Sequence, residues 1–207
     1  MKKIDKGLFI VFEGIDGAGK TSQIELLAKK IEEMGGKVHT TAEPSSLESG
    51  KALRRALSGA EPKSECEMAT MFVLDRIGHN REINEHLEKG ETVISDRYYY
   101  SSLAYQGQAT DYQWVRTMNI DCPEIRTPDI CIYLDLTPEQ SLQRISKGRE
   151  SVEIYENLEK LSVVRDAFFS VIDDLKGKGE RIFKVDASRS IEEISEEIFE
   201  IIVNAME

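Results

Sequence analysis

Gly14-Ile15-Asp16-Gly17-Ala18-Gly19-Lys20-Thr21 matches the phosphate-binding pattern G-x-x-x-x-G-K-[ST] at every specified position. The residues before it, 8–13, are mostly apolar, and apolar side chains recur after it at the spacing of one helix face: Ile24, Leu27, Ala28 and Ile31. The stretch is therefore predicted to join a buried strand to a helix. Its backbone N–H groups and Lys20 would hold phosphates, and the Thr21 hydroxyl would bind Mg²⁺. The alternative is a glycine-rich turn with no ligand.

The bulk composition bounds the class of protein. A chain of 207 residues is long enough for one α/β domain, which we expect to span 1–207. A formal charge of −11 argues against a nucleic-acid partner, which needs a basic face. No apolar run approaches the length of about 18 residues that suggests a membrane helix. Three cysteines without C-x-x-C spacing fit reduced thiols, so we expect a cytoplasmic protein; they are Cys66, Cys122 and Cys131.

Strand-forming runs and helical patterns alternate along the chain. After the first strand, further strands are expected at 37–42, 92–95, 130–134 and 182–185. Helices are expected directly after the phosphate loop, over 49–57, 64–87 and 111–119, from 138, over 161–175 and from 191. This alternation predicts an α/β fold, a three-layer sandwich of P-loop type with helices on both faces of a five-stranded parallel sheet.

Two candidate site residues lie in the first half of the chain. Pro44 pushes Glu43 toward an extended backbone at the carboxyl end of the second strand, so Glu43 either faces the site or is a solvated turn carboxylate. Arg76 interrupts the apolar face of the helix over 64–87. A buried arginine needs a partner, which is either an anion or planar polar group of a ligand, or a nearby carboxylate such as Asp75. Phe72, one turn earlier, either lies beside Arg76 or packs in the core.

The third strand delivers Asp96 and Arg97 at its carboxyl end. An aspartate in that position beside a phosphate loop is the expected Mg²⁺ partner, and Arg97 can reach a phosphate. The following segment, 98–107, is dense in hydroxyl, amide and aromatic groups, which suit a base and a sugar. Some of its three consecutive tyrosines are expected to be packing residues.

A basic cluster stands out in the acidic chain. Arg144, Lys147 and Arg149 surround Gly148 after the helix that begins near 138. The cluster is interpreted as a mobile phosphate clamp, and the alternative is a solvated basic turn.

Together these features resemble thymidylate kinase, a family of P-loop nucleoside monophosphate kinases. The resemblance covers nearly the whole chain and rests on residues 16–21, the pair Phe72 and Arg76, Asp96-Arg97-Tyr98, Ser102 to Gln106, and the basic segment before Tyr155-Glu156. It implies transfer of the γ-phosphate of ATP to dTMP, giving ADP and dTDP for thymidine nucleotide synthesis. It also implies a homodimer packed through helices, and a basic lid at about 144–154.

The resemblance implies a role for each matching residue. Asp16 would accept a hydrogen bond from the deoxyribose 3′-hydroxyl, and Arg97 would bind the acceptor phosphate. Charge on the moving phosphoryl group would be neutralised by the catalytic set: Lys20, Arg97, Mg²⁺ held by Thr21 with Asp96 nearby, and the lid residues Arg144 and Arg149. Arg144 would also belong to the ATP site.

The same resemblance assigns the nucleoside pocket. Phe72 would stack on thymine while Arg76 binds a base carbonyl. Ser102 and Gln106 would contact the base edge, and Tyr105 would lie against the sugar where a ribose 2′-hydroxyl would have to fit.

This chain departs from the family pattern in three places. Many relatives carry arginine and glycines around Glu43-Pro44, so a phosphate contact is expected to come instead from Arg54 or Arg55. Position 17 is glycine and not arginine, so the lid must supply that positive charge. Asp75 is a less familiar neighbour for Arg76, and its charge would oppose a phosphate unless it points away.

Two other functions compete with this interpretation. A deoxynucleoside kinase would use Glu43 as the base for a neutral 5′-hydroxyl, although Arg76 and Arg97 suit a charged acceptor better. A nucleotide-binding switch would hold ATP or GTP without phosphoryl transfer, although the guanine signature Asn-Lys-x-Asp is absent from the sequence.

Overall fold

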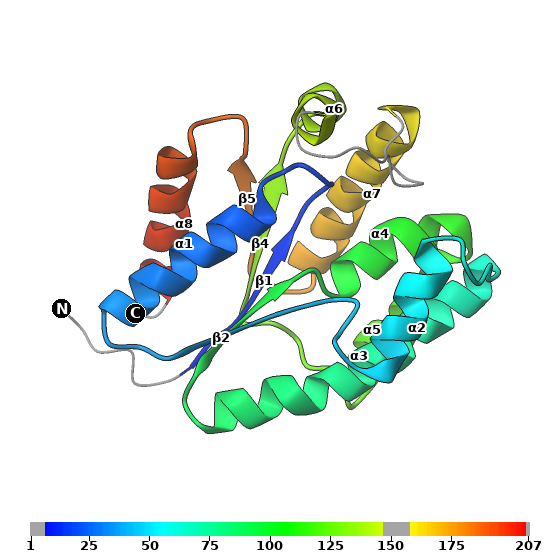
Figure 1. Cartoon of the computed structure of the whole chain (residues 1–207), viewed down its shortest axis with the longest axis horizontal. Coiled ribbons are helices and arrows are strands. Elements are labelled where there is room, and N and C mark those ends of the chain that lie inside the picture. The colour runs from blue at the N-terminus through cyan, green and yellow to red at the C-terminus, as the bar shows by residue number, and fades with distance from the viewer. Residues whose placement is uncertain (1–6, 147–157, 206–207) are drawn as a thin grey trace.

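The computed structural model describes residues 7–146 and 158–205 (Figure 1). Five strands form one parallel sheet in the order β2-β3-β1-β4-β5, which confirms the predicted α/β fold. The strands are β1 (Phe9–Glu13), β2 (Val38–Ala42), β3 (Thr92–Asp96), β4 (Ile130–Asp135) and β5 (Ile182–Asp186). The helices are α1 (Lys20–Glu33), α2 (Glu48–Leu57), α3 (Glu65–Glu88), α4 (Tyr99–Ala109), α5 (Tyr112–Ile120), α6 (Pro138–Ser146), α7 (Leu158–Lys176) and α8 (Ile191–Ala205).

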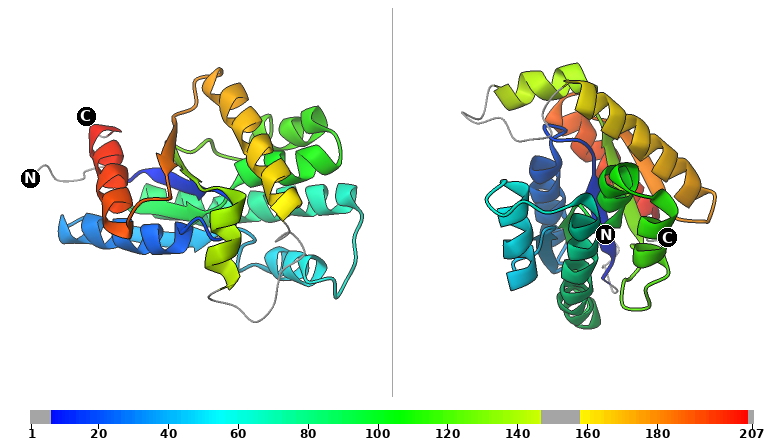
Figure 2. Two further views of the ribbon diagram at one scale, coloured as in Figure 1. Left: turned by 90° about the horizontal axis from the view of Figure 1, so that it is seen from above. Right: turned by 90° about the vertical axis from the view of Figure 1, so that its right-hand side faces the viewer.

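The central strand β1 is buried on both faces, as expected in a parallel sheet. Phe9 and Val11 point into a core shared with α3, α4, α5 and α7. Ile10 and Phe12 point the other way, into a core shared with α1 and α8. Figures 1 and 2 show these two helical layers on opposite sides of the sheet, so the three-layer sandwich follows from the period-two alternation of β1.

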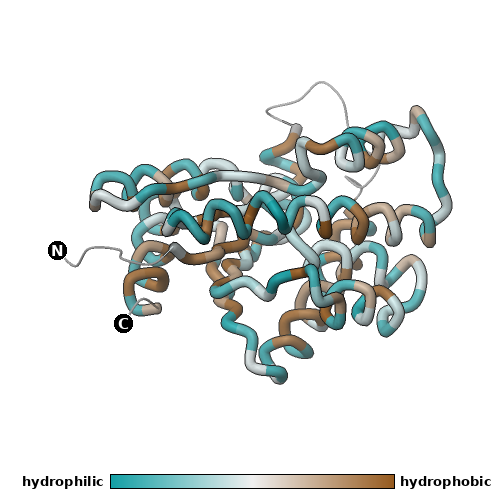
Figure 3. The backbone as a smooth tube through the Cα atoms, turned by 90° about the horizontal axis from the view of Figure 1, so that it is seen from below, coloured by the Kyte–Doolittle hydropathy of each residue, from teal (hydrophilic) through white to brown (hydrophobic). Residues whose placement is uncertain are grey.

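The helical apolar stripes that the sequence predicts cover the sheet. Ile24, Leu27 and Ile31 of α1 are in the same core as the inward residues of α8, which are Ile194, Ile198 and Ile202. In Figure 3 brown hydrophobic residues alternate with teal hydrophilic ones along the helices. Each such buried Ile or Leu contributes roughly 1.5–3 kcal/mol relative to an exposed one, so these stripes are the main stabilisation of that layer.

The strand order indicates at which edge of the sheet a ligand is expected to bind. The neighbouring strands β1 and β3 are followed by α1 and α4, which pack on opposite faces. In open α/β sheets ligands bind at the carboxyl ends of strands where the connections diverge in this way. The phosphate loop after β1 and the pair Asp96-Arg97 after β3 both lie at that edge.

The segment over 98–107, for which the sequence indicates binding groups, is largely helix α4. Tyr98, Tyr99 and Tyr100 are all buried core residues, and their hydroxyls bond other protein groups, among them Asn80 and Glu180. The three cysteine thiols form no disulfide. Within residues 7–146 and 158–205, none of the helices combines the length and the apolar character needed to cross a membrane.

Candidate active site

The phosphate loop has the backbone that its glycines allow. Gly14 and Gly17 have φ values of 140° and 76°, in the region that side chains disfavour. A Cβ at Gly14 would lie 2.6 Å from the Leu134 carbonyl oxygen, so another residue would displace β4. The loop therefore lies directly against the ends of the central strands and begins α1 at Lys20.

Lys20 is buried in this loop. Its Nζ donates to the Gly14 carbonyl oxygen at 3.1 Å and lies 3.9 Å from Asp96 Oδ1. Burial, and next the charge of Arg97, lower the pKa of Lys20. A nearby anion favours the protonated amine, so a phosphate here would strengthen the charge of Lys20.

Asp96 and Thr21 offer oxygens beside Lys20. Thr21 Oγ1 donates to Asp96 Oδ2 at 3.4 Å, and Asp96 Oδ1 is buried without a hydrogen bond from any described residue. Asp96 lies opposite Phe12 in the β1–β3 register, which places its carboxylate next to the loop. A carboxylate and a hydroxyl are oxygen ligands of the kind Mg²⁺ prefers, so these two residues fit the metal that the sequence predicts.

The side chain of Arg97, directly after β3, extends to the phosphate loop. Its Nη2 donates to Asp16 Oδ1 at 2.6 Å and its Nη1 to Ser101 Oγ at 3.0 Å, while its guanidinium lies over the Tyr105 ring. Burial opposes its charge, but Tyr105, Asp16 and Glu13 outweigh burial and raise the pKa of Arg97. The residue has φ 71°, a left-handed backbone uncommon outside glycine. This strained backbone aims a permanent cation at the loop.

Glu13 is a site residue that the sequence analysis did not single out. Its Oε1 accepts from the backbone N–H groups of Tyr98 and Ser101 at 2.9 and 3.1 Å, and its Oε2 accepts from Ser101 Oγ at 2.7 Å. Burial raises the pKa of Glu13, and the nearby Arg97 charge opposes that rise. The sequence feature that could have identified Glu13 is a charged residue at the end of an apolar strand, directly before the phosphate loop.

The sequence left two kinds of partner for Arg76, a ligand group or a nearby carboxylate such as Asp75. In the structure Arg76 pairs with a carboxylate, and that carboxylate belongs to Glu43. Arg76 Nε donates to Glu43 Oε2 at 2.9 Å, and Nη2 donates to Ser102 Oγ at 3.1 Å. The guanidinium also bonds the planar amide of Asn119. Arg76 is 1% exposed and Glu43 is 6% exposed, so Glu43 is not a solvated turn residue. His79 Nδ1 lies 3.1 Å from the other Glu43 oxygen.

Asp75 does not pair with Arg76 and points away from it. Its carboxylate accepts from the Ser45 N–H at 2.7 Å, from Ser45 Oγ at 2.6 Å and from Ser49 Oγ at 2.7 Å. Its negative charge is therefore used to hold the turn after β2. Arg54 reaches the same turn, donating to the carbonyls of Pro44 and Ser45, whereas Arg55 pairs with Glu61. Of the two arginines, Arg54 is thus the one at the sheet edge.

The other predicted nucleoside contacts come from two helices. Phe72 packs, partly buried, against a small cluster of Leu53, Ala56 and Met68 between α2 and α3. Ser102 and Gln106 are buried on α4, one turn apart, and Tyr105 packs against the core beside them. Ser102 is thereby joined to Arg76, so α3 and α4 meet at this part of the site.

Of the basic segment, the structure describes Arg144. Its Nη2 donates to the Ala187 carbonyl oxygen at 2.9 Å and its Nη1 to that of Gly17 at 3.4 Å, which places it beside the phosphate loop. Lys147, Arg149 and the pair Tyr155-Glu156 lie outside the described residues. Ser141 on the same helix donates to the Asp16 carbonyl oxygen.

A glycine loop with a buried lysine, faced by an aspartate and an arginine from the adjacent strand, defines a P-loop kinase. The sequence profile of the family described as thymidylate kinase matches residues 12–198. The probable thymidylate kinase of Methanococcus aeolicus is 38% identical over 193 residues, covering 92% of this chain and 93% of that protein. The thymidylate kinase of Leptospira borgpetersenii is 34% identical over 201 residues, with coverage of 96% and 95%. The probable thymidylate kinase of Thermococcus gammatolerans is 37% identical over 203 residues, with coverage of 93% and 94%. The chain belongs to the thymidylate kinase family.

The buried pair yields a stability prediction. In Glu43→Gln the Arg76 charge loses its carboxylate partner, and the free energy of unfolding should fall by about 3–5 kcal/mol in urea titrations, the usual effect of leaving one buried charge unpaired. The matched control Glu61→Gln removes the half-exposed partner of Arg55 and should cost less than about 1 kcal/mol. Equal losses in the two variants would contradict the importance of the buried pair. Adding Arg76→Met to Glu43→Gln should recover stability.

Proposed function

We propose that the residues at the carboxyl edge of the sheet perform the phosphoryl transfer. As a thymidylate kinase, the chain phosphorylates dTMP with ATP to give dTDP and ADP. The observation that carries the assignment of the site is the contact of Arg97 with Asp16, because it joins an arginine suited to an acceptor phosphate to the phosphate loop itself.

The donor side of the site is the loop from Gly14 to Thr21. Its inward N–H groups and the α1 N-terminus favour the ATP phosphates, and Lys20 provides a charge at the β and γ positions. Thr21 and Asp96 would hold Mg²⁺, a proposal supported by the buried Asp96 oxygen that has no hydrogen bond from the described residues. When bound, Mg²⁺ would supply positive charge that offsets the negative charge of the ATP phosphates.

The acceptor side lies across α3 and α4. Arg97 would bind the dTMP phosphate, and Asp16 would take the sugar 3′-hydroxyl. Phe72 would stack on the base, while Arg76 with Ser102 would bond a base carbonyl. Gln106 would contact the base edge, and Glu43 with Arg54 would order the turn beside it.

The mechanism requires alignment and charge neutralisation more than proton transfer. A dTMP phosphate oxygen is already an anion, so no strong base is needed, and Glu43 is held by Arg76 and His79. Lys20 and Arg97 would neutralise charge on the moving phosphoryl group. Because position 17 is glycine, we assign the additional charge to the lid segment at about 144–154, with Arg144 next to the loop and Arg149 as the second candidate.

The reaction is tested by measuring ADP release with ATP and Mg²⁺ and separate acceptors. Turnover should be largely confined to dTMP among dTMP, dUMP, dCMP, AMP, UMP and thymidine. Lys20→Met should lower kcat on the order of 10²-fold to 10³-fold, by analogy with the loss of one oxyanion donor. Turnover with thymidine alone would instead support a deoxynucleoside kinase, and binding without turnover would support a nucleotide switch.

Tyr105 supplies a specificity prediction. If its ring fills the space of a ribose 2′-hydroxyl, Tyr105→Ala should relax the ratio of kcat/KM for dTMP over ribosylthymine monophosphate by about 10-fold. The control is Tyr112→Ala, because the Tyr112 hydroxyl bonds Asp174, away from the loop. An unchanged ratio in the Tyr105 variant would remove Tyr105 from this role.

We also propose the homodimer that the family resemblance implies. Two exposed leucines support it: Leu74 of α3 is 63% exposed, and Leu47, which precedes α2 and is 38% exposed, lies against Gly78, one turn after Leu74. Leu74→Glu should convert the dimer to a monomer in size-exclusion chromatography with light scattering, since a charge would be buried in the contact. Val163→Glu, at an exposed valine of α7, should leave the mass unchanged. A wild-type monomer would refute the proposal.

We infer one kinase domain over 1–207 and a cytoplasmic location. Unpaired thiols and ATP as phosphoryl donor support the location.

A further inference from the structure

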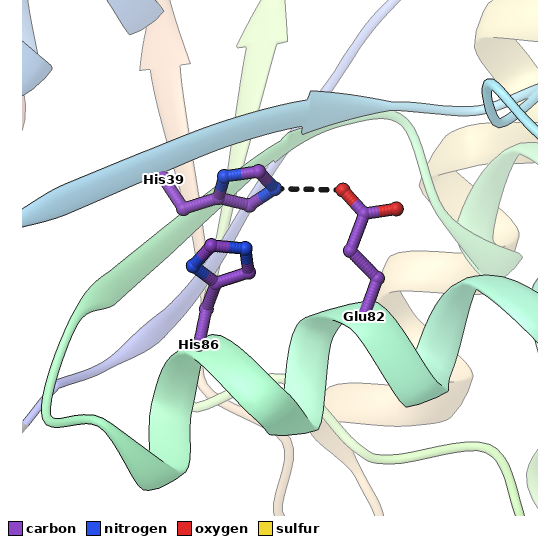
Figure 4. A group of neighbouring side chains, drawn as sticks. All are labelled: His39, Glu82 and His86. Atoms are coloured by element: carbon purple, nitrogen blue, oxygen red, sulfur yellow. Dashed lines mark hydrogen bonds and ion pairs between the residues drawn. The ribbon is translucent and has the colours of Figure 1, made fainter.

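A cluster of metal-binding side chains lies away from the phosphate loop, between β2 and the end of α3. Of the three histidines in the chain, His39 and His86 are here, with Glu82 one helical turn before His86. One ligand atom from each of the three lies within 4.8 Å of the others. Figure 4 shows the two imidazole rings stacked, with Glu82 extending toward them from α3. The phosphoryl-transfer residues do not include this cluster.

The two histidines are held close together. Their ring centroids are 3.6 Å apart and the planes differ by 5°. The side chains of His39 and His86 are each 24% exposed, so both rings are within reach of an ion from solvent. Neutral imidazole is the form that binds metal ions.

The hydrogen bonds direct one nitrogen of His86 to the cluster. Its Nδ1 lies 2.6 Å from Glu91 Oε2, and because a carboxylate only accepts, the Nδ1 carries the proton. The Nε2 of His86 is then the nitrogen that would bind a metal ion. A carboxylate that orients a histidine through its second nitrogen is the usual outer partner of a metal-binding histidine. On the other ring, His39 Nε2 lies 2.8 Å from Glu82 Oε1, so a proton is shared between these two atoms. A metal ion bound to both groups would replace the proton between His39 and Glu82.

We propose that His39, Glu82 and His86 form a binding site for Zn²⁺, with Glu91 as the orienting carboxylate. Two imidazoles and one carboxylate are a ligand set that zinc accepts, with water at the fourth position. Tetrahedral zinc needs ligand atoms about 3.4 Å apart, given bonds of about 2.0–2.2 Å, so the cluster must contract and one ring must tilt out of the parallel stack. Partly exposed rings can make that adjustment.

The site would join two elements that already meet through polar contacts. Alternate positions of β2 and its extension face α3: His39 contacts Glu82, Thr41 contacts His79, and Glu43 contacts Arg76. We name these three contacts the β2–α3 ladder. Zinc at the His39 end would stabilise the folded ladder without touching the nucleotide site, so this proposal does not depend on the proposed residue roles.

Zinc binding is tested by calorimetry and metal analysis in millimolar Mg²⁺, which occupies oxygen-rich sites. A Cys66→Ser background removes an exposed thiol that also binds zinc. This background should bind one Zn²⁺ per chain, and His39→Gln and His86→Gln should each weaken binding at least tenfold. Glu82→Gln should weaken it less. Glu88→Gln, an exposed carboxylate at the end of the same helix, should leave affinity unchanged.

Two further readouts distinguish a formed site from loose surface binding. Zinc at a hundredfold excess over Kd should raise the Tm of the background by about 5–10 °C, and the Tm of His86→Gln should not change. Co²⁺ should give the visible absorption of a four-coordinate ion, lost in His86→Gln. Circular dichroism confirms that each variant is folded. Absence of zinc from the background, or histidine variants that bind like it, would overturn the proposal.

Discussion

The buried carboxylate of Glu13 is the contact on which the geometry of the active site depends. It ends the central strand, and it accepts hydrogen bonds from the first turn of α4 at Tyr98 and Ser101. A negative charge at a helix N-terminus is favourable, and here it also joins β1 to the segment after β3. The phosphate loop and helix α4 are thereby fixed to one side chain. Since burial raises the pKa of Glu13, the ionised form depends on these donors and on Arg97.

A second constraint places the edge strand β2. Its residues are only partly buried, so apolar packing holds it weakly, and the β2–α3 ladder provides polar contacts instead. At its end the Glu43 and Arg76 side chains are 3% and 1% exposed. A buried ion pair has a large desolvation cost, so its main effect is to exclude other arrangements of these groups. We interpret the ladder as the feature that sets the position of Arg76, and with it the proposed nucleoside pocket on α3.

Local patterns predicted the fold well because each expected strand and helix had its own periodicity. The phosphate loop, Asp96 and Arg97 were also predictable, since the carboxyl ends of parallel strands meet at one edge. The partner of Arg76 was not, because Glu43 is 33 positions away and only the folded chain brings them together. Helix α4 was missed because its tyrosines and serines suggested surface chemistry, whereas three of the tyrosines around its start are core residues. Glu13 was missed, although a charge at the end of an apolar strand marked it, because its hydrogen-bond partners Tyr98 and Ser101 come from the segment after β3.

The charge distribution explains how an acidic chain can hold two phosphorylated ligands. Three of the site cations already have an anionic partner: Lys20 lies near Asp96, Arg97 bonds Asp16, and Arg76 bonds Glu43. The side chains of Arg97 and Asp16 are 20% and 29% exposed, so water still screens that pair and a phosphate can exchange for the carboxylate at modest cost. The buried Arg76 pair cannot exchange so cheaply, because leaving Glu43 unpaired would cost several kcal/mol. It follows that Arg97 suits a charged group that arrives and leaves in each cycle. Arg76, held permanently by Glu43, suits a neutral base that bonds the guanidinium without displacing its carboxylate.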